Sequence, residues 1–213
     1  MIIAIDGPSA AGKSTVAKLL AKELGIDYID TGAMYRAIAL KVMRQGVHTE
    51  DKAELAAFLA STDIDLAGTQ VLLDGEDVSG LIRTEEVSMQ ASKISAIPAV
   101  RGKLVTLQRE IGERKSVVMD GRDIGSNVFP GAEYKFFITA SPEVRAERRR
   151  LELSERGEAV NFEDVLADIK KRDWDDSNRP LNPLVQTEDA VLIITDELGI
   201  GEVLAEVIGR VRS

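Results

Sequence analysis

The chain has 213 residues, of which 44% are hydrophobic, so it can bury the core of one α/β domain with an insertion. Its net charge of −9 argues against a broad nucleic-acid-binding surface, and it has no uniformly apolar stretch long enough for a transmembrane helix. It has no cysteine, which excludes disulfides and thiol nucleophiles, and its single histidine, His48, lies in a polar turn, which argues against serine–histidine–acid chemistry.

Five short apolar runs are predicted to be β-strands. They cover residues 2–5, 28–29, 117–119, 134–138 and 191–194. Most of them are separated by segments with helical periodicity, at 16–24, 53–59, 84–97 and 100–111, after Ser141, from Asn161 and at 200–212. This alternation predicts an α/β fold in which a five-stranded parallel sheet is covered by helices on both faces.

One segment departs from this alternation. After the helix at 53–59, short strand-like runs are separated by turn residues, and Asp74-Gly75 between apolar residues is a hairpin signal. Thr84 is expected to cap a helix that runs to Ile97 and is stopped by Pro98. We therefore expect residues 37–99 to form an inserted α+β domain with a small antiparallel sheet, and residues 1–36 and 100–213 to form the core.

The segment DGPSAAGKST lies between the first strand and the first helix, where Gly-x-x-x-x-Gly-Lys-Ser forms a phosphate-binding loop. Its glycines allow the backbone amides to converge on phosphate oxygens at the positive end of the helix. Lys13 can neutralise the β- and γ-phosphates, and the Ser14 hydroxyl can ligate Mg²⁺. The residues assigned to the triphosphate are Gly7, Pro8, Ser9, Ala10, Ala11, Gly12, Lys13, Ser14 and Thr15.

Two arginines follow predicted strands. Arg36 comes just after the second strand and Arg122 just after the third. Ligands of open α/β sheets collect beyond the carboxyl ends of the strands, so both arginines are expected near the phosphate loop. A guanidinium group donates paired hydrogen bonds to phosphate, which indicates a second anionic substrate.

A further arginine cluster lies in and beyond the helix that follows Ser141. Its members are Arg145, Arg148, Arg149, Arg150 and Arg156. They fit either a mobile lid at about 145–160 over the transferring phosphates or a charged helix face paired with neighbouring glutamates. We favour the lid for at least one member and assign Arg149 to the ATP site.

Five ordered motifs resemble the bacterial cytidylate kinase family. They are DGPSAAGKST, IDTGAMYRA, DVSGLIRTEEVS, MDGRDIG with VFPGAEYKFFITAS, and RDWDDSNRPLNPL. The resemblance runs over essentially the whole chain and implies a P-loop kinase fold with an enlarged nucleotide-binding insert. It also implies a cytoplasmic enzyme of pyrimidine metabolism that uses ATP and Mg²⁺ to phosphorylate CMP or dCMP. The expected partners are these nucleotides, without nucleic acid or membrane, and the lack of an obvious heptad seam predicts a monomer.

The resemblance implies which residues bind the acceptor phosphate. Arg36, Arg122 and Arg179 would hold it, with Thr31 nearby at a position where the family often has serine. The residues with catalytic roles are then Lys13, Arg122 and Arg179. Because the acceptor phosphate is already a nucleophile, alignment and charge neutralisation suffice, and no covalent intermediate is needed.

The resemblance also implies which residues bind the nucleoside. Ser92, Arg101 and Asp123 would read the cytosine edge, where a carboxylate can accept from the exocyclic amino group. Arg172 and Asp176 would lie at the sugar.

Three points of detail follow from spacing and position. Arg172, Asp176 and Arg179 would share one face if all three lay on one helix. Trp174 points elsewhere on such a helix, so we expect it to pack against the protein. Asp120 ends the third strand, where it either contacts Mg²⁺ through water or only fixes the loop.

Three other functions are compatible with a phosphate loop. The first is a P-loop kinase with another small acceptor, which the large insert and the cytosine-reading residues disfavour. The second is a GTP-dependent switch, which usually shows an Asn-Lys-x-Asp segment that this chain lacks. The third is an ATP-driven nucleic-acid protein, which the acidic charge disfavours.

Overall fold

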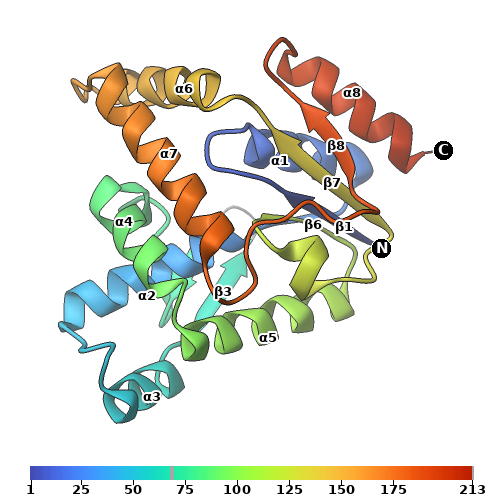
Figure 1. Ribbon diagram of the computed structural model, residues 1–213. Helices are drawn as coiled ribbons and strands as arrows, with labels where there is room; N and C mark the ends of the chain where they lie inside the picture. Colours follow the sequence, from blue (N-terminus) through green and yellow to red (C-terminus); the bar gives the residue numbers. More distant parts are fainter. Residues whose placement is uncertain (68–69, 213) are drawn as a thin grey trace. The chain divides into compact units, whose positions relative to one another are not determined.

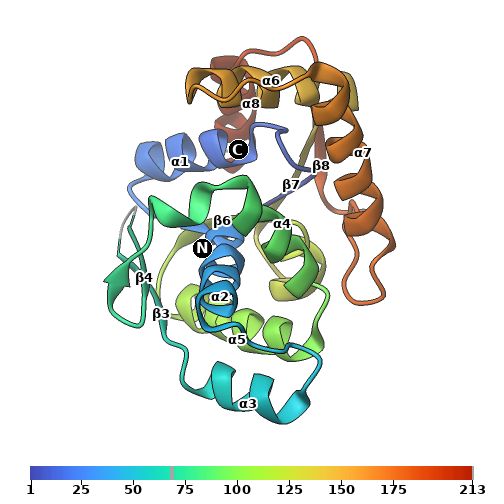
Figure 2. The same cartoon turned by 90° about the vertical axis from the view of Figure 1, so that its left-hand side faces the viewer.

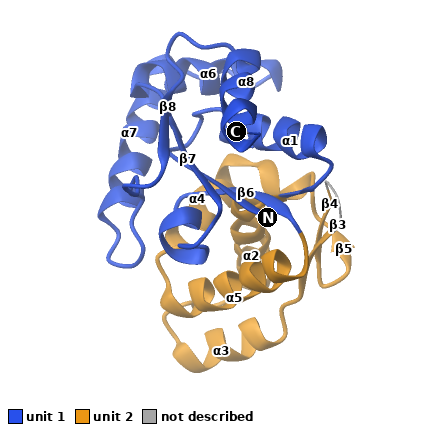
Figure 3. Cartoon of the chain, turned by 90° about the vertical axis from the view of Figure 1, so that its right-hand side faces the viewer, with its two compact units in different colours: residues 1–28, 116–213 blue, residues 29–115 orange. Residues whose placement is uncertain are grey.

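The computed structural model describes residues 1–67 and 70–212, which belong to two compact units (Figure 3). The first unit comprises residues 1–28 and 116–213, and the second comprises residues 29–115. The second unit contains the predicted insertion at 37–99 and extends beyond it at both ends.

A five-stranded sheet with the strand order β2-β6-β1-β7-β8 confirms the predicted fold class. Its strands are β1 (Ile2–Asp6), β2 (Asp27–Asp30), β6 (Val117–Gly121), β7 (Tyr134–Thr139) and β8 (Val191–Ile194). The pairs β1–β6, β1–β7 and β7–β8 are parallel. All five predicted strands are therefore confirmed, and β1, which leads into the phosphate loop, is central in the sheet.

Two helices, α1 (Lys13–Leu24) and α8 (Ile200–Val211), lie side by side against the strands of the first unit (Figure 1). Their apolar faces share a buried core with β1, β7 and β8, to which Leu20, Phe136 and Val207 contribute. The other two helices of this unit, α6 (Pro142–Glu155) and α7 (Phe162–Asn178), pack against each other through a separate apolar cluster that includes Ala146 and Ile169 (Figure 2).

The second unit contains four α-helices among its described residues, together with a short 3₁₀ helix. They are α2 (Thr31–Gln45), α3 (Lys52–Ala60), η1 (Leu81–Arg83), α4 (Glu85–Ile94) and α5 (Pro98–Arg114). Helix α2 lies beside both α4 and α5 (Figure 2).

The predicted antiparallel sheet of the second unit is confirmed. It consists of β3 (Ile64–Ala67), β4 (Gln70–Leu73) and β5 (Glu76–Asp77). The hairpin turn has positive φ values at both central residues, 50° at Asp74 and 84° at Gly75. Asp and Gly tolerate this conformation, which matches the twist of the two strands.

Polar side chains cap the predicted helix starts. The side chains of Thr84, Ser141 and Asn161 accept hydrogen bonds from amides in the first turns of α4, α6 and α7. The predicted end of α4 is wrong, because this helix stops at Ile94 and Pro98 begins α5 instead. Proline suits a first helical position, where its missing N–H would have no intrahelical partner.

Among the described residues, no helix has both the length and the apolar character needed to cross a membrane.

Candidate functional site

The phosphate loop connects β1 to α1, as the motif predicts. Gly7 has φ 145°, and a Cβ atom there would lie 2.0 Å from the Ile138 carbonyl oxygen of the neighbouring strand. Gly12 precedes α1 with φ 86°, in the left-handed region that favours glycine. The backbone therefore favours glycine at both positions, and the first residue of the loop, Gly7, packs closely against β7.

Lys13 lies in the first turn of α1 and is buried, with 5% of its surface exposed. Its Nζ donates to the Pro8 carbonyl oxygen at 2.5 Å, so the side chain folds back over the loop. Burial, together with the smaller influence of the nearby positive charge of Arg122, lowers the pKa of Lys13 from 10.5 to about 7. Two cations therefore face the same region of the first unit.

Ser14, Asp120 and Tyr28 form a hydrogen-bonded group beside the loop. The Ser14 hydroxyl donates to Asp120 Oδ2 and the Tyr28 hydroxyl to Asp120 Oδ1, both at 2.7 Å. Asp120 contacts the loop directly in this structure, as one of its two predicted roles requires. The group also offers hydroxyl and carboxylate oxygens side by side, the ligand type that Mg²⁺ prefers, so these residues fit that ion.

Two arginine–carboxylate pairs follow β6. Arg122 Nε donates to Asp176 Oδ2 at 2.7 Å, and Arg179 NH2 donates to Asp123 Oδ1 at 3.0 Å. Asp123 also accepts from the Asn127 amide at 3.0 Å. The carboxylates raise the pKa of Arg122 although burial, the largest influence, opposes this, so the arginine stays charged. The structure thus brings together four of the residues predicted to bind the acceptor.

Arg179 does not lie on the helix that carries Arg172 and Asp176, so the condition for a shared face of the three residues is not met. Helix α7 ends at Asn178, and Arg179 is extended with φ −62° and ψ 140°. Its Nε donates to the Asn182 carbonyl oxygen at 2.6 Å. Arg179 is therefore oriented by the chain reversal after α7 and not by helical spacing.

Asp6, the last residue of β1, is a buried carboxylate that sequence reasoning missed. Its two oxygens accept from the backbone amides of Ile124 and Gly125 at 2.8 and 2.7 Å. Burial raises the pKa of Asp6 from 3.8 to about 6, with a smaller contribution from the charge of Asp123, although the two amides oppose this shift. Its position immediately before the phosphate loop is the sequence feature from which Asp6 could have been identified.

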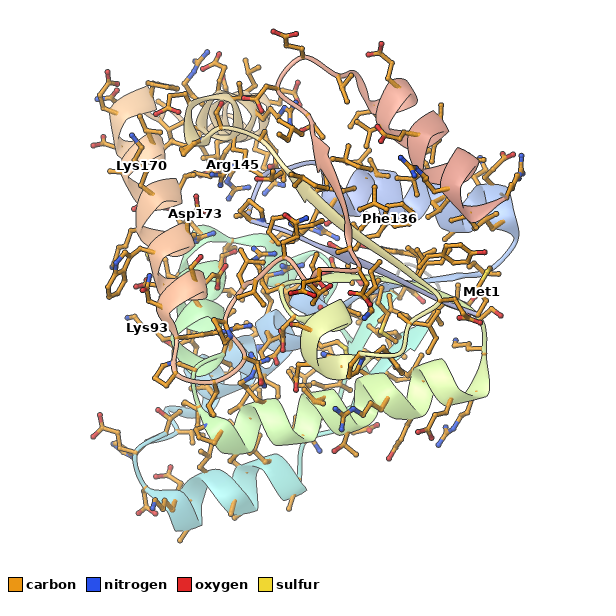
Figure 4. All side chains as sticks on the ribbon, turned by 45° about the vertical axis from the view of Figure 1, so that its right-hand side comes forward. Met1, Lys93, Phe136, Arg145, Lys170 and Asp173 are labelled. Carbon is orange, nitrogen blue, oxygen red and sulfur yellow. The ribbon has the colours of Figure 1, made fainter. Side chains whose placement is uncertain are left out.

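Arg145 is a buried link between helices α6 and α7 and the phosphate loop. It donates to Asp173 in bidentate fashion at 2.9 and 2.6 Å, and to the Ser9 carbonyl oxygen at 3.3 Å. Both Arg145 and Asp173 are labelled in Figure 4. Its Nε donates to the Ala140 carbonyl oxygen at 2.8 Å. With 2% of its surface exposed, Arg145 is a fixed structural group in this structure.

The other arginines of this cluster have different partners. Arg148 donates to the hydroxyl and carbonyl oxygens of Thr195 at 2.9 and 2.6 Å. Arg149 and Arg150 pair with glutamates one turn away on α6, and Arg156 pairs with Glu152. In this structure Arg149, Arg150 and Arg156 are therefore paired with glutamates, as expected for a charged helix face.

Arg36 lies in the second turn of α2, in the second unit. Asp30 caps this helix by accepting from the Ala33 amide at 2.8 Å, and it also accepts from Arg36 NH2 at 3.0 Å. Gly32 lies beneath this pair, since a Cβ there would approach Arg36 NH1 to 3.0 Å. Thr31 is the first residue of α2 and is buried.

Arg101 and Ser92 lie near each other in the second unit. Arg101 is buried on α5, with its guanidinium 5.8 Å from the centre of the Tyr35 ring and NH1 donating to the Ser95 carbonyl oxygen at 3.3 Å. Ser95 in turn donates to the Ser92 carbonyl oxygen at 2.7 Å. Sequence reasoning missed Tyr35, although it directly precedes Arg36.

Two aromatic predictions have different outcomes. His48 is exposed and lies 3.2 Å from Glu54, which confirms the solvated position. Trp174 was expected to pack against the protein, but 66% of its surface is exposed on α7, so that prediction is wrong. Arg172 lies on the same helix and is partly buried.

Comparisons with known proteins agree over nearly the whole chain. The family model for cytidylate kinase matches residues 3–213. The chain is 54% identical to a cytidylate kinase from Caldanaerobacter subterraneus over 99% of this chain and 94% of that protein, and 46% identical to one from Clostridioides difficile over 99% and 98%. A shikimate kinase structure from Bacteroides thetaiotaomicron covers 100% of this chain and 99% of its own, with TM-score 0.53 and 14% identity, which supports the fold.

Proposed function

Because this chain belongs to the cytidylate kinase family and transfers the γ-phosphoryl group of ATP to CMP or dCMP, we propose that Lys13, Arg122 and Arg179 are its catalytic residues. The observation that carries this proposal is that Lys13 lies at the end of the loop that follows β1, while Arg122 directly follows β6, the parallel neighbour of β1. The charge of Arg122 also helps to lower the pKa of Lys13. Two neighbouring cations repel each other until an anion lies between them. The phosphoryl group in transfer supplies that anion.

The phosphate loop, residues 7–15, is proposed to bind ATP. Its conformation and the N-terminus of α1 suit a triphosphate, and Lys13 would exchange its bond to the Pro8 carbonyl oxygen for phosphate oxygens. Arg149 would contribute from α6 by leaving its partner Glu152. Closure of the segment at 145–160 over ATP belongs to this proposal, with Arg145 as its fixed point.

Mg²⁺ is proposed to bind at Ser14. Bound there, it would neutralise charge on the β- and γ-phosphates. Asp120 accepts from the Ser14 hydroxyl in this structure, which supports a role in which its carboxylate would hold a water of the metal.

The residues proposed to bind the acceptor phosphate are Arg36, Arg122 and Arg179, together with Thr31. Each of these arginines already donates to a carboxylate: Asp30, Asp176 and Asp123 respectively. These pairs keep the guanidinium groups oriented and charged, and a phosphate replaces or shares the partner when it binds.

The nucleoside is proposed to bind five residues, of which Ser92 and Arg101 lie in the second unit. Asp123 would accept from the cytosine amino group, because a carboxylate has lone pairs beyond those that Arg179 and Asn127 occupy. Arg172 and Asp176 on α7 would contact the sugar.

The reaction needs no covalent intermediate. A phosphate oxygen of CMP attacks the γ-phosphorus, the new P–O bond forms, and the bond to the β-phosphate oxygen breaks to release ADP. Lys13 and the arginines neutralise the charge on the transferring group, and no proton acceptor is required from the protein. The enzyme is proposed to act in the cytoplasm as a monomer, without nucleic acid or membrane.

An acceptor assay tests the assigned site. With ATP and Mg²⁺, CMP and dCMP are expected to be phosphorylated far better than UMP or AMP. Asp123→Ala should raise the KM for CMP at least tenfold while the KM for ATP stays within about twofold, because the base-reading groups lose a partner. UMP or AMP as the best acceptor, or an equal loss for ATP, would contradict the assignment.

A further inference from the structure

The carboxylate of Asp6 has no role in the reaction described above, although it lies directly beside the phosphate loop. It ends β1, directly precedes Gly7 of the phosphate loop and is 6% exposed. Both of its oxygens are used by amides of consecutive residues, Ile124 and Gly125. Asp6 therefore fixes two adjacent peptide groups to the end of the strand that carries the loop.

Those two peptide groups follow Arg122 and Asp123 directly. Ile124–Val128 forms one π-helical turn, η2, whose first amides have no acceptor within the turn itself. Asp6 supplies these acceptors. The backbone between Asp123 and Gly125 has few free dihedral angles, so anchoring the amides orients the side chains just before them.

Gly125 also packs closely against Lys135. A Cβ atom on Gly125 would lie 3.2 Å from Lys135 Cδ and 3.3 Å from Cγ, and 3.4 Å from Asp6 Oδ2. Lys135 is itself anchored, since its Nζ donates to the Pro130 carbonyl oxygen at 2.5 Å and to Asp189 at 2.6 Å. The turn therefore packs closely against the Asp6 carboxylate and an anchored lysine stem, and a side chain at position 125 would require the Lys135 stem to shift by a few tenths of an ångström.

We propose that Asp6 is a positioning residue of the transfer reaction, which with Gly125 and Lys135 holds Arg122 and Asp123 in the orientation that binds the acceptor nucleotide. This inference rests on the proposed roles of Arg122 and Asp123. A carboxylate is needed because asparagine has one acceptor oxygen, and its amide nitrogen would face a second N–H donor. In this role Asp6 acts through the backbone amides that it anchors and not by contact with a nucleotide.

Steady-state kinetics of Asp6→Asn test the proposal. The KM for CMP is expected to rise at least tenfold, while the dissociation constant for ATP stays within about twofold and the protein remains folded in thermal unfolding. Asp51→Asn is the matched control, because Asp51 also accepts from two backbone amides, those of Ala53 and Glu54, at the exposed start of α3. A wild-type KM for CMP in Asp6→Asn, or an equal loss of ATP affinity, overturns the proposal.

A second pair of variants keeps the test open if Asp6→Asn does not fold. Gly125→Ala is expected to raise the KM for CMP, because its methyl group displaces the turn from the Lys135 stem. Lys135→Ala removes the atoms that the methyl group meets. Adding Gly125→Ala to Lys135→Ala should therefore raise the KM for CMP much less than adding it to the wild type. A full defect that persists in the double variant contradicts the proposed contact.

Arg122→Ala and Asp123→Ala, measured in parallel, distinguish a failure of the proposed acceptor site from a failure of the positioning role of Asp6. If neither raises the KM for CMP, the proposed acceptor site is wrong. If both raise it while Asp6→Asn and Gly125→Ala do not, the acceptor site stands and the positioning role of Asp6 is wrong.

Discussion

Lys13 is expected to take up a proton when ATP binds above neutral pH. In the free protein, burial and the charge of Arg122 lower its pKa to about 7. The nearest hydrogen-bond acceptor of its Nζ is a neutral carbonyl oxygen, that of Pro8. Bound phosphates favour the ammonium form strongly, so the pKa must rise when ATP is present.

The size of the effect follows from the pKa of the free protein. With a value of about 7, Lys13 is protonated in roughly nine-tenths of molecules at pH 6 and one-tenth at pH 8. If bound ATP restores a pKa well above 8, binding takes up about 0.1 proton at pH 6 and about 0.9 at pH 8. The apparent ATP affinity therefore falls roughly tenfold between these two pH values.

Isothermal titration calorimetry measures this uptake directly. A non-hydrolysable ATP analogue is titrated at saturating Mg²⁺ in two buffers with different ionisation enthalpies, at pH 6 and at pH 8. Lys13→Ala should abolish the uptake at pH 8, and it should also cripple turnover. Because Asp6 remains in that variant, any contribution from the Asp6 carboxyl appears as the residual signal.

Two results would refute this reasoning. The first is a proton uptake that is the same at pH 6 and pH 8, which would show that the Lys13 pKa is not near 7 in the free protein. The second is full uptake in Lys13→Ala, which would assign the proton to another group.

Three further changes have expected outcomes. Asp120→Asn should raise the Mg²⁺ concentration needed for half-maximal rate at least tenfold, and an unchanged requirement in a Mg²⁺ titration would disconnect Asp120 from the metal. Arg145→Ala leaves Asp173 without its buried partner, so urea unfolding should show a loss of about 3 kcal/mol; a loss below about 1 kcal/mol would contradict the structural role of Arg145. The raised pKa of Asp6 means that the folded protein binds this proton more tightly than the unfolded chain, so the group stabilises at low pH and loses that contribution as pH rises through about 6. The stability of wild type relative to Asp6→Asn should therefore drop by about 1 kcal/mol between pH 5 and pH 7.5, and no drop in urea unfolding would contradict the pKa.

The fold was predictable because local and global signals agree in this chain. Apolar runs bounded by turn residues predicted each strand of the parallel sheet, and Thr84, Ser141 and Asn161 predicted three helix starts through capping chemistry that involves only neighbouring residues. Pro98 shows the limit of such signals. Proline both ends and begins helices, and the contacts of α5 with α2 and α3 decide between the two.

The site was less predictable because side-chain partners come from distant parts of the chain. The spacing of the arginine cluster on α6 could not separate Arg145, which pairs with Asp173 and the loop carbonyl of Ser9, from Arg149, which pairs with a neighbour on its own helix. Arg179 does not share a helix with Arg172 and Asp176, because Pro180 disfavours helical geometry at the residue before it and α7 ends at Asn178. Gly125, the last residue of DGRDIG, was part of the family resemblance. The Lys135 stem, which leaves little space for a larger side chain at this position, lies ten residues further along the chain.

Asp6 at the end of β1 and Lys13 at the start of α1 show how burial makes a charged side chain unfavourable in the free protein and effective in phosphate binding. Burial is the main cause of both pKa shifts: it lowers the pKa of Lys13 to about 7 and raises that of Asp6 to about 6. The Lys13 shift from 10.5 corresponds to about 5 kcal/mol by which the free protein disfavours the ammonium form. A surface lysine would avoid this cost, but water would then screen its attraction to phosphate. In the buried position the attraction is little screened, so the ammonium form becomes stable when the phosphates arrive, and much of the electrostatic stabilisation of Lys13 appears only in the nucleotide complex.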